Sequence, residues 1–208
     1  AIAVALLCST FATTAVAQAA PDKLVRDNTD KIIILIKAHR DTYTKDNKKL
    51  YAMVNEVVLP HFDFRKMAQL VLGVSWRQAN EDQRARFANE FRDLLVRTYA
   101  TVLLKYNNEE VVYLPYKPSP GEKTTTVKVE VKLGGSAPPV PIHYDFYLTD
   151  TAWKVYDVVI DGVSLVTNYR ATYADRIKND GLDALIASMA KSNRDGTPAE
   201  PVMKPRAK

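Results

Sequence analysis

The chain has 208 residues, of which 47% are hydrophobic and 25% are charged, which suits one globular domain with a sizeable core and is short for two. The formal net charge of +5 is mildly basic, but the sequence contains no block of Lys and Arg and no basic stripe interleaved with aromatic residues, which argues against nucleic acid as a partner. Anionic membrane surfaces and acidic protein partners remain open.

Residues 1–19 are typical of a secretory signal peptide, truncated at its start. The segment carries no charge, and its apolar run is followed by small residues with A-x-A cleavage choices that end at Ala17 and Ala19. A membrane anchor is the alternative, but the segment is short and rich in Thr and Ser. Cys8 is the only cysteine, so the cleaved chain would have no disulfide, no thiol nucleophile and no Cys-ligated zinc. We therefore expect a periplasmic protein.

Helical periodicity and capping signals fill the chain from Asp22 to about residue 106. The first helix contains IIILI, five consecutive apolar residues that cover a helix all round, so this helix should be buried on more than one side. Asp63 is a predicted N-cap, and Asn80 with Gln83 forms a predicted capping box. The expected helices cover residues 22–42, residues 46–59, residues 63–72 and a long stretch from residue 81.

A period of two then replaces the helical period. Apolar residues alternate with Lys128, Glu130 and Lys132, which predicts a strand with one wet face. We expect an antiparallel meander of four strands, followed by helices over residues 163–178 and 182–191. The predicted fold is α+β, a four-stranded antiparallel sheet wrapped by helices, in a single domain over residues 20–193. Residues 194–208 carry Pro and charge with little to bury, which predicts a disordered tail.

The last predicted strand, WKVYDVVI, is apolar on both faces if it is regular. Strict alternation places Val155 on one face, and Val158 and Ile160 on the other. Something must then cover the second face. Either helices pack against both faces of the sheet in a solid interaction module, or a cavity stays open for an apolar ligand.

The sequence contains none of the common catalytic signatures. The sequence lacks the P-loop, G-x-G-x-x-G, G-x-S-x-G and H-E-x-x-H motifs, so we expect no cofactor and no metal. His143 and Asp145 share a strand face, which permits a dyad but more simply describes a polar surface. Asp157 and Asp161 permit a small cone-shaped enzyme of the isomerase or dehydratase type. A structural hydrogen bond for Asp157 and a turn for Asp161 are the alternatives.

Three segments resemble the MlaC family, also called the toluene-tolerance family. They are residues 59–95, residues 153–170 and residues 181–186, and the resemblance extends in matching order from about Asp22 to Asn193. Members are periplasmic phospholipid carriers of the maintenance-of-lipid-asymmetry pathway. The resemblance implies a deep apolar pocket between sheet and helices, which holds acyl chains and leaves the headgroup in water.

The resemblance also implies the partners. A member carries phospholipid between an outer-membrane lipoprotein–porin complex and the ring subunit of an inner-membrane ABC transporter. It implies no catalytic residues, and we expect a monomer that is not an enzyme. Arg65, Lys66 and Arg170 could meet the lipid phosphate if they border the mouth. The predicted pocket walls, of which about half should touch ligand, are Val58, Met67, Leu70, Val71, Phe91, Leu95, Tyr99, Tyr144, Phe146, Tyr156, Val158, Ile160, Val163 and Val166.

Overall fold

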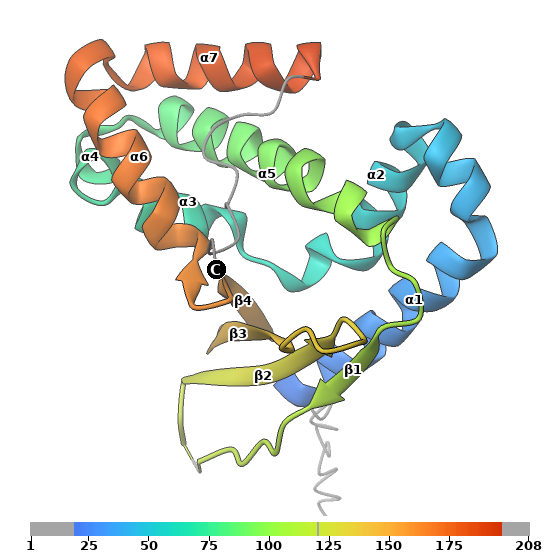
Figure 1. Ribbon diagram of the computed structural model, residues 1–208. Coiled ribbons are helices and arrows are strands. Elements are labelled where there is room, and N and C mark those ends of the chain that lie inside the picture. Colours follow the sequence, from blue (N-terminus) through green and yellow to red (C-terminus); the bar gives the residue numbers. More distant parts are fainter. Residues whose placement is uncertain (1–18, 120, 197–208) are drawn as a thin grey trace, which may run out of the picture.

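The computed structural model describes residues 19–119 and 121–196 (Figure 1). The predicted signal peptide up to residue 18, with Cys8, and the tail beyond residue 196 lie outside the described residues. The chain opens with helices, continues as an antiparallel sheet, and closes with two more helices. The predicted α+β class is therefore confirmed.

The N-terminal helices follow their local signals. The Asp63 side chain accepts a hydrogen bond from the Lys66 N–H at 2.8 Å, and Asn80 and Gln83 form the reciprocal bonds of a capping box at 2.8 and 3.0 Å. A short helix, α4, follows Gly73 (φ 55°) and was not predicted. The elements are α1 (Pro21–Lys45), α2 (Asn47–Val57), the 3-10 turn η1 (Leu59–His61), α3 (Phe64–Leu72), α4 (Val74–Gln78) and α5 (Glu81–Leu103).

In the part of the chain that the structure describes, the sheet contains five strands in sequential order, all antiparallel. The fifth strand was not predicted, because we expected a helix to start at Val163. The two residues of this strand pair with β4, and Ser164 then caps the next helix by accepting a hydrogen bond from the Thr167 N–H at 3.0 Å. The strands are β1 (Glu110–Tyr113), β2 (Thr124–Lys132), β3 (Val140–Leu148), β4 (Trp153–Ile160) and β5 (Val163–Ser164).

Helices α6 (Leu165–Asp180) and α7 (Leu182–Asp195) complete the fold. The predicted tail boundary at residue 194 is too early, because α7 continues to Asp195. Asn193 holds the end of this helix, which extends beyond the predicted residue 191. Its amide donates hydrogen bonds to the carbonyl and the carboxylate of Glu90 on α5, at 3.0 and 2.7 Å.

The strand β4 is not regular, and this corrects the predicted phase. Phe146 on β3 pairs with Val155, but the preceding residue, Asp145, pairs with Asp157. Tyr156 is therefore an extra residue, a β-bulge. Beyond the bulge the alternation is reset, so that Val155 shares a face with Val158 and Ile160. One face of the sheet is apolar, and the other is polar.

Helices cover the apolar face of the sheet in two groups (Figure 1). Residues from α3, the first half of α5, α6 and α7 form one buried cluster together with the inner face of the sheet. Residues from the second half of α1, α2 and the end of α5 form a separate cluster. A domain of this size usually has one continuous core. The gap between the two clusters is where a site can form.

Candidate functional site

A cavity lies between the two hydrophobic clusters. Its volume is about 300 Å³, and its walls come from α2, α3, α5 and the apolar face of β3 and β4. Val54 and Ala100 on its wall belong to the helical cluster, whereas Met67 and Val158 belong to the cluster on the sheet. The remaining lining residues are Ile32, Val58, Leu59, Phe62, Phe64, Leu95, Val96, Tyr99, Val102, Leu103, Ile142, Tyr144, Ile160 and Leu165.

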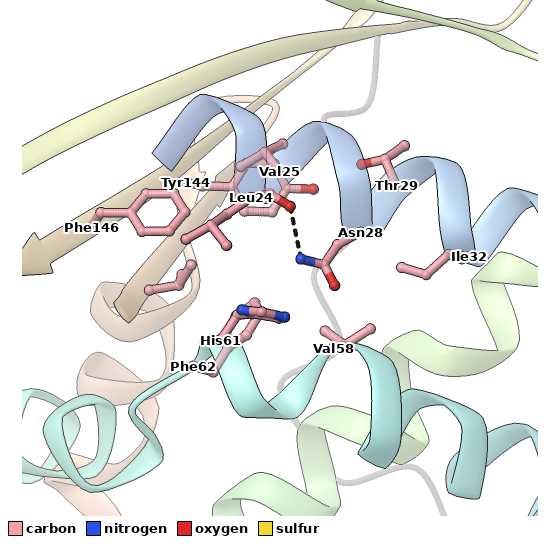
Figure 2. Close-up of a pocket in the computed structure, with 11 residues that line it drawn as sticks. Leu24, Val25, Asn28, Thr29, Ile32, Val58, His61, Phe62, Tyr144 and Phe146 are labelled. Carbon is pink, nitrogen blue, oxygen red and sulfur yellow. Dashed lines mark hydrogen bonds between the residues drawn. The ribbon is translucent and has the colours of Figure 1, made fainter. Parts of the chain in front are cut away.

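Two smaller cavities adjoin the first one along α1. One, of about 180 Å³, lies between α1 and strands β1–β3. The other, of about 80 Å³, lies between the start of α1 and the η1 segment (Figure 2). Ile32 on α1 and Tyr144 on β3 line all three. The three cavities therefore lie next to one another beside α1.

The lining is mostly apolar. Among the residues that the structure describes, no Asp, Glu, Lys or Arg lines any of the three cavities. Burial raises the pKa of Tyr144 to about 12, so this phenol is neutral at physiological pH. Such a surface suits hydrocarbon, and Asn28, Thr29 and His61 interrupt it in the smallest cavity.

Eight of the fourteen predicted wall residues line these cavities. Five of the eight come from helices α3 and α5 or from β4, two come from β3, and one directly follows α2. They are Val58, Met67, Leu95, Tyr99, Tyr144, Phe146, Val158 and Ile160. Their distribution over both hydrophobic clusters explains why a single helical or strand face could not define the cavity.

The other six predicted wall residues lie elsewhere. Val71, Phe91 and Val166 are buried in the cluster on the sheet, and Leu70 packs against that cluster. Val163 is exposed on β5. Tyr156 is turned away by the bulge and stacks edge-on against Tyr147 on the polar face, with ring centroids 6.0 Å apart.

The predicted walls omitted α1, which contributes to every cavity. Thr29, Ile32, Ile33 and Ile36 line the space beside β1–β3. The signal was present in the sequence, because IIILI indicated a helix buried on more than one side. Which apolar face would meet protein and which would meet empty space depends on how α1 crosses the sheet, and this is a tertiary property.

The three basic residues proposed for the lipid phosphate do not border the cavities. Arg65 pairs with Glu81 at 2.7 Å, and Lys66 lies 5.8 Å from the centre of the Tyr147 ring. The Arg170 guanidinium donates to the carbonyl of Leu70 at 2.6 Å.

The two carboxylates of the enzymatic alternative are also engaged elsewhere. Asp157 is buried and accepts hydrogen bonds from the N–H groups of Val158 and Val166, at 2.8 and 3.0 Å, and from the Ser164 hydroxyl. Burial raises the pKa of Asp157, against the opposing effect of these hydrogen bonds. Asp157 lines none of these three cavities, so it cannot contact a substrate in them. Asp161 is an exposed turn residue with φ 49°.

The pair of His143 and Asp145 lies on the polar face of the sheet. Asp145 accepts a hydrogen bond from the Thr126 hydroxyl at 2.6 Å, as a strand surface in water would allow. Over residues 19–119 and 121–196, no group of three His, Cys, Asp or Glu side chains is placed to hold a metal ion. No helix in those ranges is both long enough and apolar enough to cross a membrane.

Comparison with known proteins agrees with this geometry. The model of the family described as MlaC protein matches residues 26–191. The chain belongs to the MlaC family. The toluene tolerance protein Ttg2D of Pseudomonas putida is 26% identical over 95% of each chain. The MlaC of Haemophilus influenzae, an intermembrane phospholipid transport system binding protein, is 25% identical over 86% of this chain and 85% of its own.

A solved structure shares the fold. The phospholipid-binding protein from Ralstonia solanacearum, determined in complex with a phospholipid, superposes with a TM-score of 0.77 at 28% identity. The match covers 86% of this chain and 99% of that one. MlaC proteins are phospholipid-binding transport proteins and not enzymes, which agrees with the sequence-based expectation.

Proposed function

We propose that this MlaC protein is a periplasmic phospholipid carrier whose bound acyl chains occupy the cavities between α1, α2, α5 and the sheet. One observation carries the proposal: a member of this family has an apolar cavity of about 300 Å³, without a charged wall residue, at the junction of two hydrophobic clusters. Ligand sites in proteins commonly have volumes of about 300–1,000 Å³ and mostly apolar walls.

The energetics explain what such a cavity does. Each methylene moved from water into an apolar site gains about 0.8 kcal/mol, so the roughly thirty methylenes of a two-chain lipid gain on the order of 20 kcal/mol. A bilayer offers the same gain. The cavity therefore allows lipid to cross water but gives no direction to transport, which must come from the partners that dock with the carrier.

The proposed partners lie at the two membranes. We infer that the protein, as a monomer, receives or delivers phospholipid at an outer-membrane lipoprotein–porin complex and at the ring subunit of an inner-membrane ABC transporter. The Haemophilus influenzae relative is a binding protein of an intermembrane phospholipid transport system, which supports this proposal.

The first test is the cargo itself. Native mass spectrometry of the purified protein should show phospholipid bound, and delipidated protein should take up phospholipid from vesicles. Protein that carries no lipid and acquires none from vesicles would contradict the proposal.

The second test uses two positions on one helix. Ile32 lines all three cavities, whereas Ile34 is 65% exposed on the outer side of α1. Ile32→Trp should reduce lipid uptake because the larger side chain occupies the shared space, and Ile34→Trp is the matched control with normal uptake. Equal uptake by both variants would show that lipid binds outside these cavities.

A further inference from the structure

The turn between α1 and α2 carries a group of lysines that lies outside the cavities. We call this turn, residues 45–49, the α1–α2 corner. Lys45, Lys48 and Lys49 are all exposed there, and none of them lines a cavity. Figure 1 shows the corner on the side of the helices away from the sheet. The corner therefore presents its positive charge to the surroundings of the protein.

The charge of the corner is not neutralised within the described part of the chain. No ion pair of residues 19–119 and 121–196 involves a lysine of the corner or Arg97, whose guanidinium lies 5.8 Å from the centre of the nearby Tyr51 ring. Asp46, the one carboxylate in the corner, accepts the Lys48 N–H at 3.0 Å as the cap of α2. Like charges this close repel one another and do not stabilise the fold, so they suit a partner with negative charge.

The composition of the corner fits an anionic lipid surface better than an acidic protein face. Protein interfaces are enriched in Arg and aromatic residues, depleted in Lys, and centred on buried anchor side chains. The exposed large apolar side chains of the described residues all lie outside the corner. Arg40 is turned inward, where it donates to the carbonyls of Leu104 and Tyr106. The flexible point charges that remain, all from lysines, suit a diffuse layer of lipid phosphates.

We propose that the α1–α2 corner binds reversibly to the surface of an anionic phospholipid membrane. The lysine ammonium groups lie near the phosphates of the bilayer, and the contact is electrostatic. This membrane site is separate from the cavities. It goes beyond the proposed carrier function and does not require a lipid in the cavity.

The corner is joined rigidly to the helices that line the cavities. Tyr43 precedes it on α1 and Leu50 follows it on α2, and both are buried in the helical cluster. Val54 of α2 belongs to the same cluster and lines the cavity of about 300 Å³. A membrane that holds the corner therefore also fixes the orientation of the cavity walls relative to the bilayer.

The experiment sediments vesicles together with the purified protein. The vesicles consist of dioleoylphosphatidylglycerol, which is anionic, or of dioleoylphosphatidylcholine, which has no net charge. Docked protein is pelleted with the vesicles, whereas protein that has only taken lipid into its cavity stays in the supernatant. The unmodified protein should be pelleted by the anionic vesicles alone, and less so as salt is raised from about 10 to about 150 mM.

The corner variant combines Lys45→Gln, Lys48→Gln and Lys49→Gln. Each lysine near an anionic surface strengthens binding about five-fold, so this variant should bind anionic vesicles on the order of 100-fold more weakly. The matched control combines Lys117→Gln, Lys123→Gln and Lys128→Gln, which changes the net charge equally. These three lysines are exposed on β2 and on the loop before it, and no ion pair in the described ranges involves them.

At about 100 mM salt, where charges are screened over about 10 Å, the control should bind within about two-fold of the unmodified protein. Equal weakening of both variants would assign the binding to net charge and overturn the proposal. So would unmodified protein that stays in the supernatant, or that binds immobilised polyglutamate through the corner but does not bind vesicles.

Native mass spectrometry of the same samples separates this proposal from the carrier function. The corner variant should carry as much cavity lipid as the unmodified protein. A corner variant that loses its lipid together with its vesicle binding would show that the lysines act through the fold, which would contradict the proposal. Unmodified protein that carries lipid without docking would refute the membrane site and leave the carrier function intact. Docking by protein that never carries lipid would support the membrane site and refute the carrier function.

Discussion

The buried Asp157 provides the most direct test of how the strand β4 is joined to α6. One carboxylate oxygen accepts both the Val158 and the Val166 N–H, and the other accepts the Ser164 hydroxyl. Val166 is the second residue of α6, so this carboxylate acts as a remote cap for the helix. Replacing it by Ala leaves two backbone donors without an acceptor in a buried site.

The magnitude follows from those two donors. A buried N–H that loses its partner costs about 1–3 kcal/mol, so Asp157→Ala should lower the free energy of unfolding by about 3 kcal/mol. In a domain of this size that corresponds to a melting temperature lower by about 6–12 °C. Asp157→Asn should lose less than about 1 kcal/mol, because a single amide oxygen can retain both N–H bonds and the amide nitrogen can donate to the Ser164 hydroxyl.

Urea titration followed by circular dichroism measures both variants, with Asp161→Asn as the matched control. Asp161 is exposed at φ 49°, a conformation that Asn tolerates, so its substitution should change stability by less than about 0.5 kcal/mol. If Asp157→Ala is as stable as the control, the carboxylate does not hold the two elements together. If Asn is as damaging as Ala, charge and not hydrogen-bond geometry is what matters.

Three further predictions concern pH, α1 and the end of α7. The pKa of Asp157 is raised in the folded state. The stability of the unmodified protein relative to Asp157→Asn should therefore be greatest below about pH 3.8, fall as the pH rises through the folded pKa, and then stay constant. A stability difference that grows with pH in urea titrations would contradict this prediction. Arg40→Ala removes two hydrogen bonds to carbonyls just after α5. This substitution should lower the free energy of unfolding by about 1–2 kcal/mol and speed amide hydrogen exchange at the end of α5. Unchanged exchange would refute this contact. Gly196→Ala should lower the free energy of unfolding by about 1 kcal/mol in urea titrations, because the position has φ 74° and a Cβ would lie 2.9 Å from the Arg97 guanidinium. Equal stability of the variant and the unmodified protein would contradict the left-handed cap.

The helices could be predicted because their signals are local. The Asp63 cap, the Asn80 capping box and the stop before Pro60 depend on residues within one turn of each other, and the structure contains all three. Element order and the antiparallel sheet followed from the change of hydrophobic period. The family resemblance is confirmed by the family match.

The phase of β4 could not be predicted by alternation alone. A bulge adds one residue without requiring Gly or Pro, so VYDVV carries no obvious signal. One clue was present: strict alternation placed Asp157 in phase with Val155, and a carboxylate in an apolar row is unfavourable. The bulge at Tyr156 resolves that conflict, and the same shift makes Tyr156 a wrong prediction for the pocket wall.

The cavity persists because two long helices each belong to both hydrophobic clusters. Val25 near the start of α1 packs in the cluster on the sheet, and Ile36 packs in the helical cluster. On α5, Leu95 belongs to the first cluster and Val96 to the second. The stretch of α1 between its two anchors crosses the gap, and its residues line empty space.

Apolar side chains that face an unfilled space lack the contacts of a packed core. Hydrocarbon that enters this space can supply part of those contacts. Each cluster has buried side chains of its own, such as Phe91 in one and Leu50 in the other, and neither of these lines the space between the clusters. Under the proposed function, lipid would enter and leave the space between two separately packed cores, so that neither core has to come apart.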